Sequence, residues 1–147
     1  MSPVHGTSVA IGGDGVLLRG PSGSGKSDLA LRLIDQGATL VADDQTMLHR
    51  RNGRLEMSAP ATIAGLLEVR GLGIVRVASA RDVPLRLVVD LVPVEAIERL
   101  PEPRFAELEG LSVPLLELAP FAASATARLR LALSALAPLA AEAFGVP

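Results

Sequence analysis

The residues with the most specific chemistry are the eight from Gly20 to Ser27, which read Gly-Pro-Ser-Gly-Ser-Gly-Lys-Ser. They match the pattern G-x-x-x-x-G-K-[ST] at every fixed position. Glycines in such a loop allow the backbone amides to turn inward and form an anion site at the start of a helix. We expect Lys26 to neutralise the β- and γ-phosphates of a nucleoside triphosphate, and Ser27 to offer its hydroxyl to Mg²⁺. The predicted cofactor-binding residues are Gly20, Pro21, Ser22, Gly23, Ser24, Gly25, Lys26 and Ser27.

Lys26 stands out among the basic residues. The sequence has 14 Lys and Arg residues, and Lys26 is its single lysine. A compact ammonium can enter a tight ring of phosphate oxygens that excludes a broad guanidinium group. The alternative interpretation is a glycine-rich loop that matches the pattern by chance. The lone lysine and the elements that flank the loop favour the phosphate site.

A pair of carboxylates follows one helix and one strand later. Asp43 and Asp44 lie at the predicted end of a strand. In a parallel arrangement the carboxyl ends of neighbouring strands meet at one edge of the sheet, so these carboxylates should face the glycine loop. One can bind Mg²⁺ through water and the other can accept a proton, and the sequence alone does not say which does which. A solvated turn is the alternative, and the neighbouring loop favours the functional interpretation.

Three further residues belong to weaker patterns. Glu68 and Arg70 precede a glycine turn and would share one face of a strand. Glu68 would then be a second Mg²⁺ ligand and Arg70 would stabilise charge on a transferring phosphate, but an ordinary surface ion pair fits the spacing equally well. His5 is either a proton shuttle or a solvated side chain, and a lone histidine near the start of a chain favours the second interpretation.

The elements that must position these residues follow from hydrophobic periodicity and turn residues. Val4–Ile11 and Val16–Arg19 read as strands joined by a glycine-rich turn, and a helix is expected from Ser27 to about Gln36. A strand over 38–42 completes the order strand, glycine loop, helix, strand of a P-loop unit. We therefore predict an α/β fold with a P-loop core of mixed β-sheet and flanking helices.

The rest of the chain adds strands and one long helix. Asn52-Gly53 predicts a β-hairpin, and further strands are expected over 66–69, 73–77 and 85–91. The Pro- and Glu-rich segment 93–114 is left unassigned except for a helix over Glu95–Leu100. Ser124 can cap a final helix with an apolar stripe of Leu129, Leu133 and Leu136. No repeat or linker divides the 147 residues, so we expect a single domain over residues 1–147.

Composition excludes several classes of function. The net charge of -2 gives no electrostatic footprint for nucleic acid, and three Phe with no Tyr or Trp give no row of stacking side chains for single strands. No apolar stretch is long enough to cross a bilayer, so we expect no membrane partner. Met1–Ile11 lacks the features of a signal peptide, and the expected location is cytoplasmic.

Several segments together resemble the catalytic domain of bacterial HPr kinase/phosphorylase. They occur in the family's order and cover most of Val4–Val77. The glycine loop is common to many proteins, whereas the Ala-Asp-Asp and Glu-x-Arg-Gly-Leu-Gly elements at these distances are much more specific. The matching pieces are His5-Gly6, Gly20–Ser27 with the helix Asp28–Gln36, Leu40–Asp44 and Leu67–Ile74.

The resemblance implies a P-loop core related to the nucleotide-dependent carboxykinases, with ATP and Mg²⁺ as cofactors. It implies Lys26 on the phosphates, Ser27 and Glu68 on Mg²⁺, and Asp44 as the base toward an acceptor serine. It also implies His5 as a catalytic neighbour, and Arg99 resembles a later active-site arginine of the family. Together with Asp43 and Arg70 from the motifs above, the predicted metal residues are Ser27, Asp43 and Glu68, and the predicted catalytic residues are His5, Lys26, Asp44, Arg70 and Arg99.

Two departures from the family's pattern change the expectation. The chain begins almost at the catalytic motifs, which is typical of a short form without the N-terminal domain of longer members. Val113–Glu117 leads to no Gly-Arg-Asn element, which argues against the reverse, phosphate-driven phosphorylase reaction.

The leading hypothesis is a Mg²⁺-dependent serine protein kinase that phosphorylates the phosphocarrier HPr. The resemblance and the Ala- and Leu-rich C-terminal segment also suggest a homo-oligomer. A small-molecule P-loop kinase is the first alternative, and it lacks a lid-like Arg-rich segment near the loop. A nucleotide-binding switch or sensor without transfer activity is the second.

Overall fold

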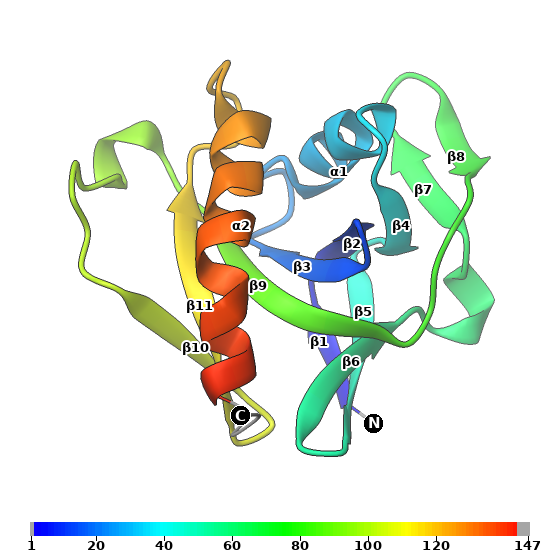
Figure 1. The fold of residues 1–147 in the computed structure, drawn as a ribbon. Helices are drawn as coiled ribbons and strands as arrows, with labels where there is room; N and C mark the ends of the chain where they lie inside the picture. The colour runs from blue at the N-terminus through cyan, green and yellow to red at the C-terminus, as the bar shows by residue number, and fades with distance from the viewer. Residues whose placement is uncertain (1, 144–147) are drawn as a thin grey trace.

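Eleven strands and two α-helices make up the part of the chain that the computed structural model describes, residues 2–143 (Figure 1). The helices are α1 (Lys26–Asp35) and α2 (Ala125–Ala143), and two short 3-10 turns are η1 (Ala61–Ile63) and η2 (Val94–Ala96). The strands are β1 (Ser2–His5), β2 (Thr7–Ile11), β3 (Asp14–Arg19), β4 (Thr39–Ala42), β5 (Gln45–Arg51), β6 (Arg54–Ser58), β7 (Leu66–Val69), β8 (Gly73–Arg76), β9 (Val83–Leu91), β10 (Arg104–Leu108) and β11 (Leu111–Leu118).

The nine-stranded curled sheet is organised around β9, its longest strand. β9 pairs in parallel with β3 and with β11, and its first residues pair antiparallel with β6. Three parallel strands therefore end at the same edge of the sheet. β7 and β8 form a separate two-stranded hairpin.

One bent antiparallel ribbon joins the two ends of the sheet. The chain from Ser2 to Ile11 runs against the chain from Thr39 to Arg51, first as β1 with β5 and then as β2 with β4. The bend lies at Gly6, whose amide donates to the carbonyl of Asp44 at 2.9 Å. A Cβ on Gly6 would lie 2.8 Å from both the Leu17 side chain and the Leu18 carbonyl, so only glycine fits there. The single strand predicted over Val4–Ile11 is therefore two strands that meet at this bend.

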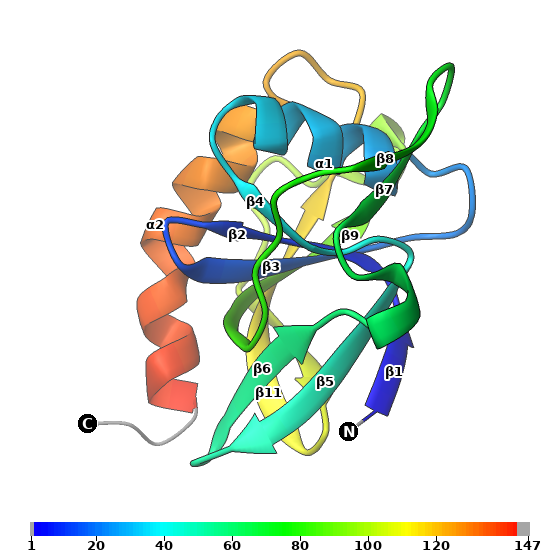
Figure 2. The same ribbon diagram turned by 90° about the vertical axis from the view of Figure 1, so that its right-hand side faces the viewer.

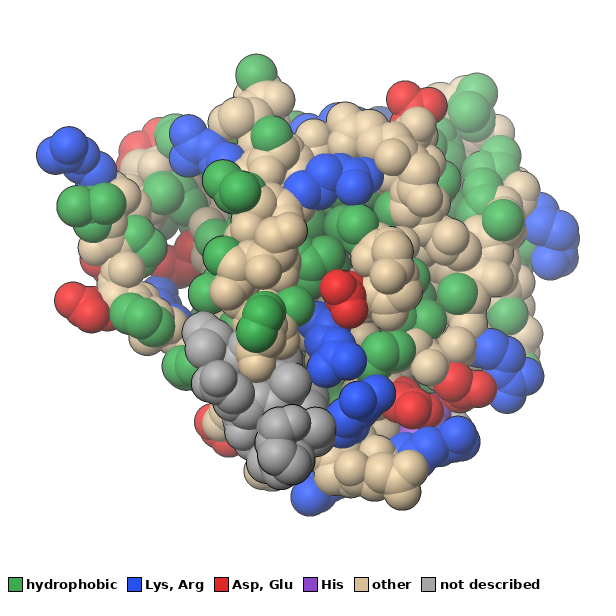
Figure 3. All heavy atoms as spheres, viewed as in Figure 1, with side chains coloured by type: hydrophobic (Ala, Val, Ile, Leu, Met, Phe, Trp, Pro, Cys, Tyr) green, Lys and Arg blue, Asp and Glu red, His purple; other side chains and the backbone are tan. Residues whose placement is uncertain are grey.

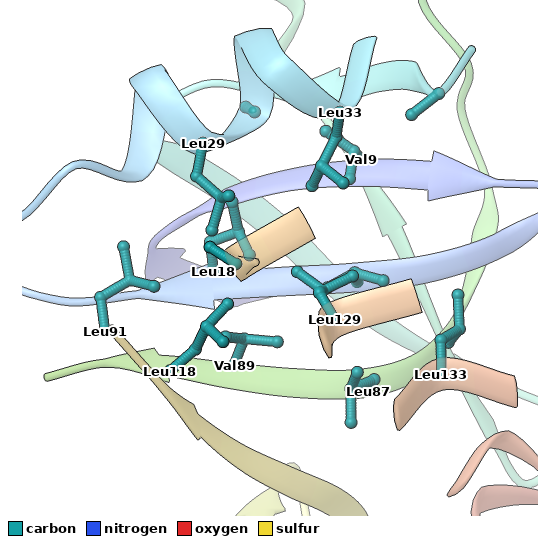
Figure 4. Packing of buried hydrophobic residues seen from close by; sticks show 14 residues of the cluster. Val9, Leu18, Leu29, Leu33, Leu87, Val89, Leu91, Leu118, Leu129 and Leu133 are labelled. Carbon is teal, nitrogen blue, oxygen red and sulfur yellow. The ribbon is translucent and has the colours of Figure 1, made fainter. Parts of the chain in front are cut away.

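The core has two layers, one on each face of the sheet. Leu18, Val89, Leu29 and Leu129 pack together between the sheet and the two helices (Figure 4). Side chains of the opposite face pack among β3, β5, β6 and β9, as expected from the alternation along a strand. Figure 2 shows α1 and α2 over β2 and β3, with the β5–β6 hairpin on the far side.

Most of the elements predicted in the first half of the chain are confirmed. The helix after the glycine loop, the Asn52-Gly53 hairpin and the strand after the helix all form close to their predicted limits. The strands before and after α1, β3 and β4, were expected to be parallel neighbours, and they are not neighbours. β3 and β4 do run in the same direction, but the antiparallel strand β2 lies between them.

The segment 93–114 differs most from the sequence prediction. The helix expected over Glu95–Leu100 is wrong, because only the 3-10 turn η2 forms and an irregular stretch follows it. A helix of six residues has too few internal hydrogen bonds to persist without packing, and most of these side chains are exposed. The unassigned remainder is the β10–β11 hairpin, which turns at Glu109 and Gly110 with φ values of 50° and 76°.

Helix α2 confirms the predicted apolar stripe. Leu129 and Leu133 are buried, and Leu136 packs against the same cluster. Leu131 lies on the outer side with 74% of its surface exposed, and apolar side chains are visible along α2 in Figure 3. The helix therefore presents one buried face to the sheet and a second, partly apolar face to solvent.

We predict that Leu129→Ala lowers the free energy of unfolding by about 2–5 kcal/mol, because it leaves a cavity in the core. Leu131→Ala is the matched control on the same helix, and it should change stability by less than about 0.5 kcal/mol. Urea unfolding of both variants measures the difference. Equal losses in the two variants would contradict the packing described for α2.

Candidate active site

The glycine loop, residues 20–25, connects the end of β3 to the start of α1. Gly25 is the N-cap residue of α1, has a φ of 102°, and no side chain caps the helix. The first backbone amides of α1 therefore remain available to an anion, in the positive field of the helix N-terminus. The predicted loop thus ends at an uncapped helix N-terminus, a place at which proteins can bind anions.

Lys26 lies under this loop with 6% of its surface exposed. Its Nζ donates to the carbonyls of Gly20 at 2.7 Å and of Pro21 at 3.1 Å. An ammonium has three donors, so one remains for a ligand. The hydroxyl of Ser24 is buried and has no hydrogen-bond partner among the described residues. A spare cationic donor and an unpaired buried hydroxyl in one loop fit an oxygen-rich anion such as a phosphate chain.

The carboxylate of Asp43 accepts hydrogen bonds from three different elements of the site. Its Oδ1 accepts from Ser27 Oγ at 2.7 Å and from Thr7 Oγ1 at 3.0 Å, and its Oδ2 accepts from the amide of Glu68 at 2.9 Å. These three donors come from α1, β2 and β7, and the residue is 7% exposed. Because the Ser27 hydroxyl donates its hydrogen bond to Asp43, the lone pairs of the Ser27 oxygen are free to bind a hard cation. The Ser27–Asp43 pair thus fits Mg²⁺.

Asp44 differs from its neighbour in both backbone and exposure. It is the central residue of a three-residue turn in which Gln45 N donates to Asp43 O at 2.7 Å, and its φ is 66°. Its amide donates to Thr7 Oγ1 at 3.0 Å. The side chain is 73% exposed, and its Oδ1 lies 3.0 Å from Nε2 of His5. Asp44 therefore presents a carboxylate to solvent from a fixed backbone.

The remaining predicted residues are less closely joined to this cluster. Glu68 reaches Asp43 through its backbone amide, while its side chain is exposed. Arg70 is exposed and lies one residue beyond β7, so the alternation along a strand does not place it beside Glu68, and no ion pair joins the two within residues 2–143. Arg99 is exposed in the stretch after η2. Over the same residues, neither arginine has a hydrogen bond to the cluster.

Two contributors were missed by sequence reasoning. Thr7 links both aspartates, since its hydroxyl donates to Asp43 and accepts from Asp44. Arg19 pairs with Asp90 through two hydrogen bonds of 2.7 and 3.0 Å at the carboxyl ends of β3 and β9, next to the glycine loop. The available signal for Thr7 was a polar side chain in a strand that is otherwise mostly apolar and buried. Nothing in the sequence links Arg19 to a partner 71 positions away.

Two other features of the described residues lie away from this cluster. His49, Glu56 and Asp82 place potential metal-binding atoms within 4.8 Å of one another, but Arg51 and Arg81 already pair with the two carboxylates. An apolar groove of about 240 Å³ lies between the stretch after η2 and β11, and none of the predicted site residues lines it.

Comparison with known proteins identifies relatives over most of the chain. The family model described as the HPr serine kinase C-terminal domain matches residues 1–122. HPr kinase/phosphorylase from Leptothrix cholodnii is 43% identical over an alignment of 122 residues, which covers 74% of this chain and 38% of that protein. The protein of the same name from Clostridium tetani is 49% identical over 76 residues, 52% of this chain and 25% of its own length. The chain thus spans about a quarter to two fifths of these curated relatives.

A solved structure agrees with the fold. The HPr(Ser) kinase/phosphatase from Coxiella burnetii superposes with a TM-score of 0.82 at 27% identity, covering 99% of this chain and 95% of that chain. Among the described residues, no helix is both long enough and apolar enough to span a membrane.

We predict that Thr7→Val destabilises the protein by about 1–3 kcal/mol, because valine has the shape of threonine but leaves a buried hydrogen-bond network unsatisfied. Thr7→Ser is the control, since it retains the hydroxyl that joins Asp43 to Asp44. Urea unfolding measures both variants. If Thr7→Val is as stable as Thr7→Ser, the hydroxyl does not hold the two aspartates in place.

Proposed function

The chain belongs to the family of the HPr serine kinase C-terminal domain, and we propose that it is the catalytic domain of a Mg²⁺-dependent kinase that transfers the γ-phosphoryl group of ATP to a serine of HPr. We assign it a P-loop core of the carboxykinase type. The observation that carries the proposal is the chain of hydrogen bonds from Ser27 through Asp43 and Thr7 to Asp44, next to a buried lysine.

The nucleotide end of the site is assigned to the glycine loop and α1. Lys26 would bind the β- and γ-phosphates, and the free amides at the start of α1 would hold the same oxygens. Ser27 would bind Mg²⁺ through its hydroxyl oxygen while its hydroxyl donates a hydrogen bond to Asp43, and Asp43 would reach the ion directly or through water. Mg²⁺ would neutralise charge on the phosphate oxygens during transfer. Glu68 is the proposed further ligand, because its backbone is already tied to Asp43.

The acceptor end of the site is assigned to Asp44. Its carboxylate is exposed, so a serine on another protein can approach it, whereas Asp43 is buried and occupied by three donors. As the serine oxygen attacks the γ-phosphorus, its proton would pass to Asp44, and ADP would leave with the former bridging oxygen. His5 would orient the Asp44 carboxylate through their 3.0 Å contact.

Arg70 and Arg99 are proposed to stabilise the transferring phosphoryl group only after the acceptor binds, since both are exposed and neither is joined to the cluster in the described part of the chain. We propose that residues 1–147 form a single catalytic domain, and that the protein acts in the cytoplasm as a homo-oligomer. The kinase direction is the proposed activity, and the phosphorylase direction is not, because the Gly-Arg-Asn element is lacking in the sequence.

The direct test is incubation of the purified chain with γ-labelled ATP, Mg²⁺ and HPr from the same source. We expect label on one HPr serine, lost when Mg²⁺ is chelated. ATP binding without labelled HPr would favour the nucleotide-binding switch, and label on a metabolite in place of HPr would favour a small-molecule kinase. Incubation of serine-phosphorylated HPr with inorganic phosphate tests the reverse reaction, for which we expect no release.

We predict that Asp44→Asn lowers the rate of transfer by about 10²–10⁴-fold, the usual contribution of a general base, while ATP affinity stays within about two-fold. Asparagine tolerates the positive φ of this position, so the turn should survive. Asp35→Asn, at the exposed end of α1, is the matched control and should retain the parental rate. An Asp44→Asn protein that phosphorylates HPr at the parental rate would show that another group takes the proton.

A further inference from the structure

An exposed aromatic ring lies beside the glycine loop. Phe121 belongs to the segment 119–124 that connects β11 to α2, and 70% of its surface is exposed. This segment lies at the same edge of the sheet as the glycine loop, because β3, β9 and β11 are parallel neighbours. In open α/β sheets, ligands bind beyond the carboxyl ends of such strands.

The ring lies against Gly25, the N-cap residue of α1. A Cβ on Gly25 would lie 2.9 Å from Cζ and 3.3 Å from Cε1 of Phe121, and 3.3 Å from Cβ of Pro120. Any other residue at Gly25 would therefore displace the ring or be displaced by it. The two ring atoms nearest to Gly25, Cζ and Cε1, are neighbours in the ring, and 70% of the surface of Phe121 is exposed to solvent.

The backbone that carries this ring is fixed to α1. Arg32 donates a hydrogen bond from Nη2 to the carbonyl of Pro120, and its Nε is held by Asp28 at 3.1 Å. Pro120 itself is buried. The backbone next to Phe121 is thus fixed beside the glycine loop before any ligand binds, which reduces the ordering cost of a stacking contact.

We propose that Phe121 is the platform on which the base of the bound nucleotide stacks. The inference rests on the proposed function: with the phosphates held by the glycine loop and the start of α1, the ribose and base extend from that helix end, where the ring lies. Aromatic rings stack on any base, because every base has a π-face. Within residues 2–143 the only other phenylalanine is Phe105, on β10, and the chain has no Tyr or Trp that could replace Phe121.

The experiment uses the fact that the chain contains no Trp and no Tyr. Phe121→Trp creates a single fluorophore at the proposed platform, and Phe105→Trp, at a position that is 44% exposed on β10, is the matched control. Each full-length variant is titrated with MgATP and with Mg-tripolyphosphate, which has the phosphates but no base. We expect MgATP to quench the fluorescence of the Phe121→Trp variant and tripolyphosphate to leave it unchanged. The fluorescence of the Phe105→Trp variant should respond to neither ligand, and a Phe121→Trp signal that MgATP leaves unchanged while it binds would contradict the stacking role.

Affinity gives a second, independent measurement. By calorimetry, Phe121→Ala should weaken MgATP binding about ten-fold, in line with the loss of one base–aromatic stack, and leave tripolyphosphate affinity within about two-fold of the parent. Equal weakening for both ligands would mean that the ring only shapes the glycine loop, and would overturn the inference. Unchanged MgATP affinity with slower transfer to HPr would also overturn it, because the ring would then contact the acceptor protein.

Failure of the proposed function would give a different binding result from failure of the stacking role alone. If the parental chain binds neither MgATP nor tripolyphosphate, the nucleotide site itself is wrong and the platform is excluded with it. If the parent binds both and Phe121→Ala is indistinguishable from it, the nucleotide site stands and only the stacking role is lost.

Discussion

The buried carboxylate of Asp43 is the interaction on which the arrangement of the site depends. Burying a carboxylate is costly unless donors replace the water that it loses, and here Thr7, Ser27 and the amide of Glu68 do so. These donors come from β2, α1 and β7, three elements far apart along the chain. Satisfying one carboxylate therefore fixes the start of α1 relative to the sheet and holds the β7–β8 hairpin beside it.

The bend in the antiparallel ribbon explains why the two adjacent aspartates have different surroundings. Gly6, between β1 and β2, faces Asp44, between β4 and β5, and the amide of Gly6 donates to the carbonyl of Asp44 at 2.9 Å. At this point β1 and β5 continue into one part of the curled sheet, while β2 and β4 continue into another. Asp43 directly follows β4, which pairs with β2, and its side chain is buried. Asp44 lies at the bend itself, where its exposed side chain contacts His5. A straight ribbon would not need the tight turn at which Asp44 is exposed.

The sequence predicted those features that are encoded locally. The glycine loop, α1 and the Asn52-Gly53 hairpin follow from spacing and turn residues a few positions apart, and all three form where expected. The β10–β11 hairpin was missed because its turn, Glu109-Gly110, is not a typical hairpin pair and Pro114 interrupts the strand pattern. The position of β2 between β3 and β4, and the bridging hydroxyl of Thr7, depend on partners distant along the chain, as the separation of 36 between Thr7 and Asp43 shows. Periodicity contains no information of that kind.

The backbone of Asp44 is strained, because its positive φ costs a non-glycine residue about 1–3 kcal/mol. Glycine at this position would relieve the strain but would remove the carboxylate that His5 contacts. The strain is opposed by hydrogen bonds to both backbone groups of Asp44, from its amide to Thr7 and from Gly6 to its carbonyl. The Thr7 hydroxyl that accepts from the amide of Asp44 also donates to the carboxylate of Asp43. The hydrogen bond that opposes the strain at Asp44 is therefore coupled to Asp43. The acceptor side and the nucleotide side of the proposed site are therefore held in register by one threonine hydroxyl.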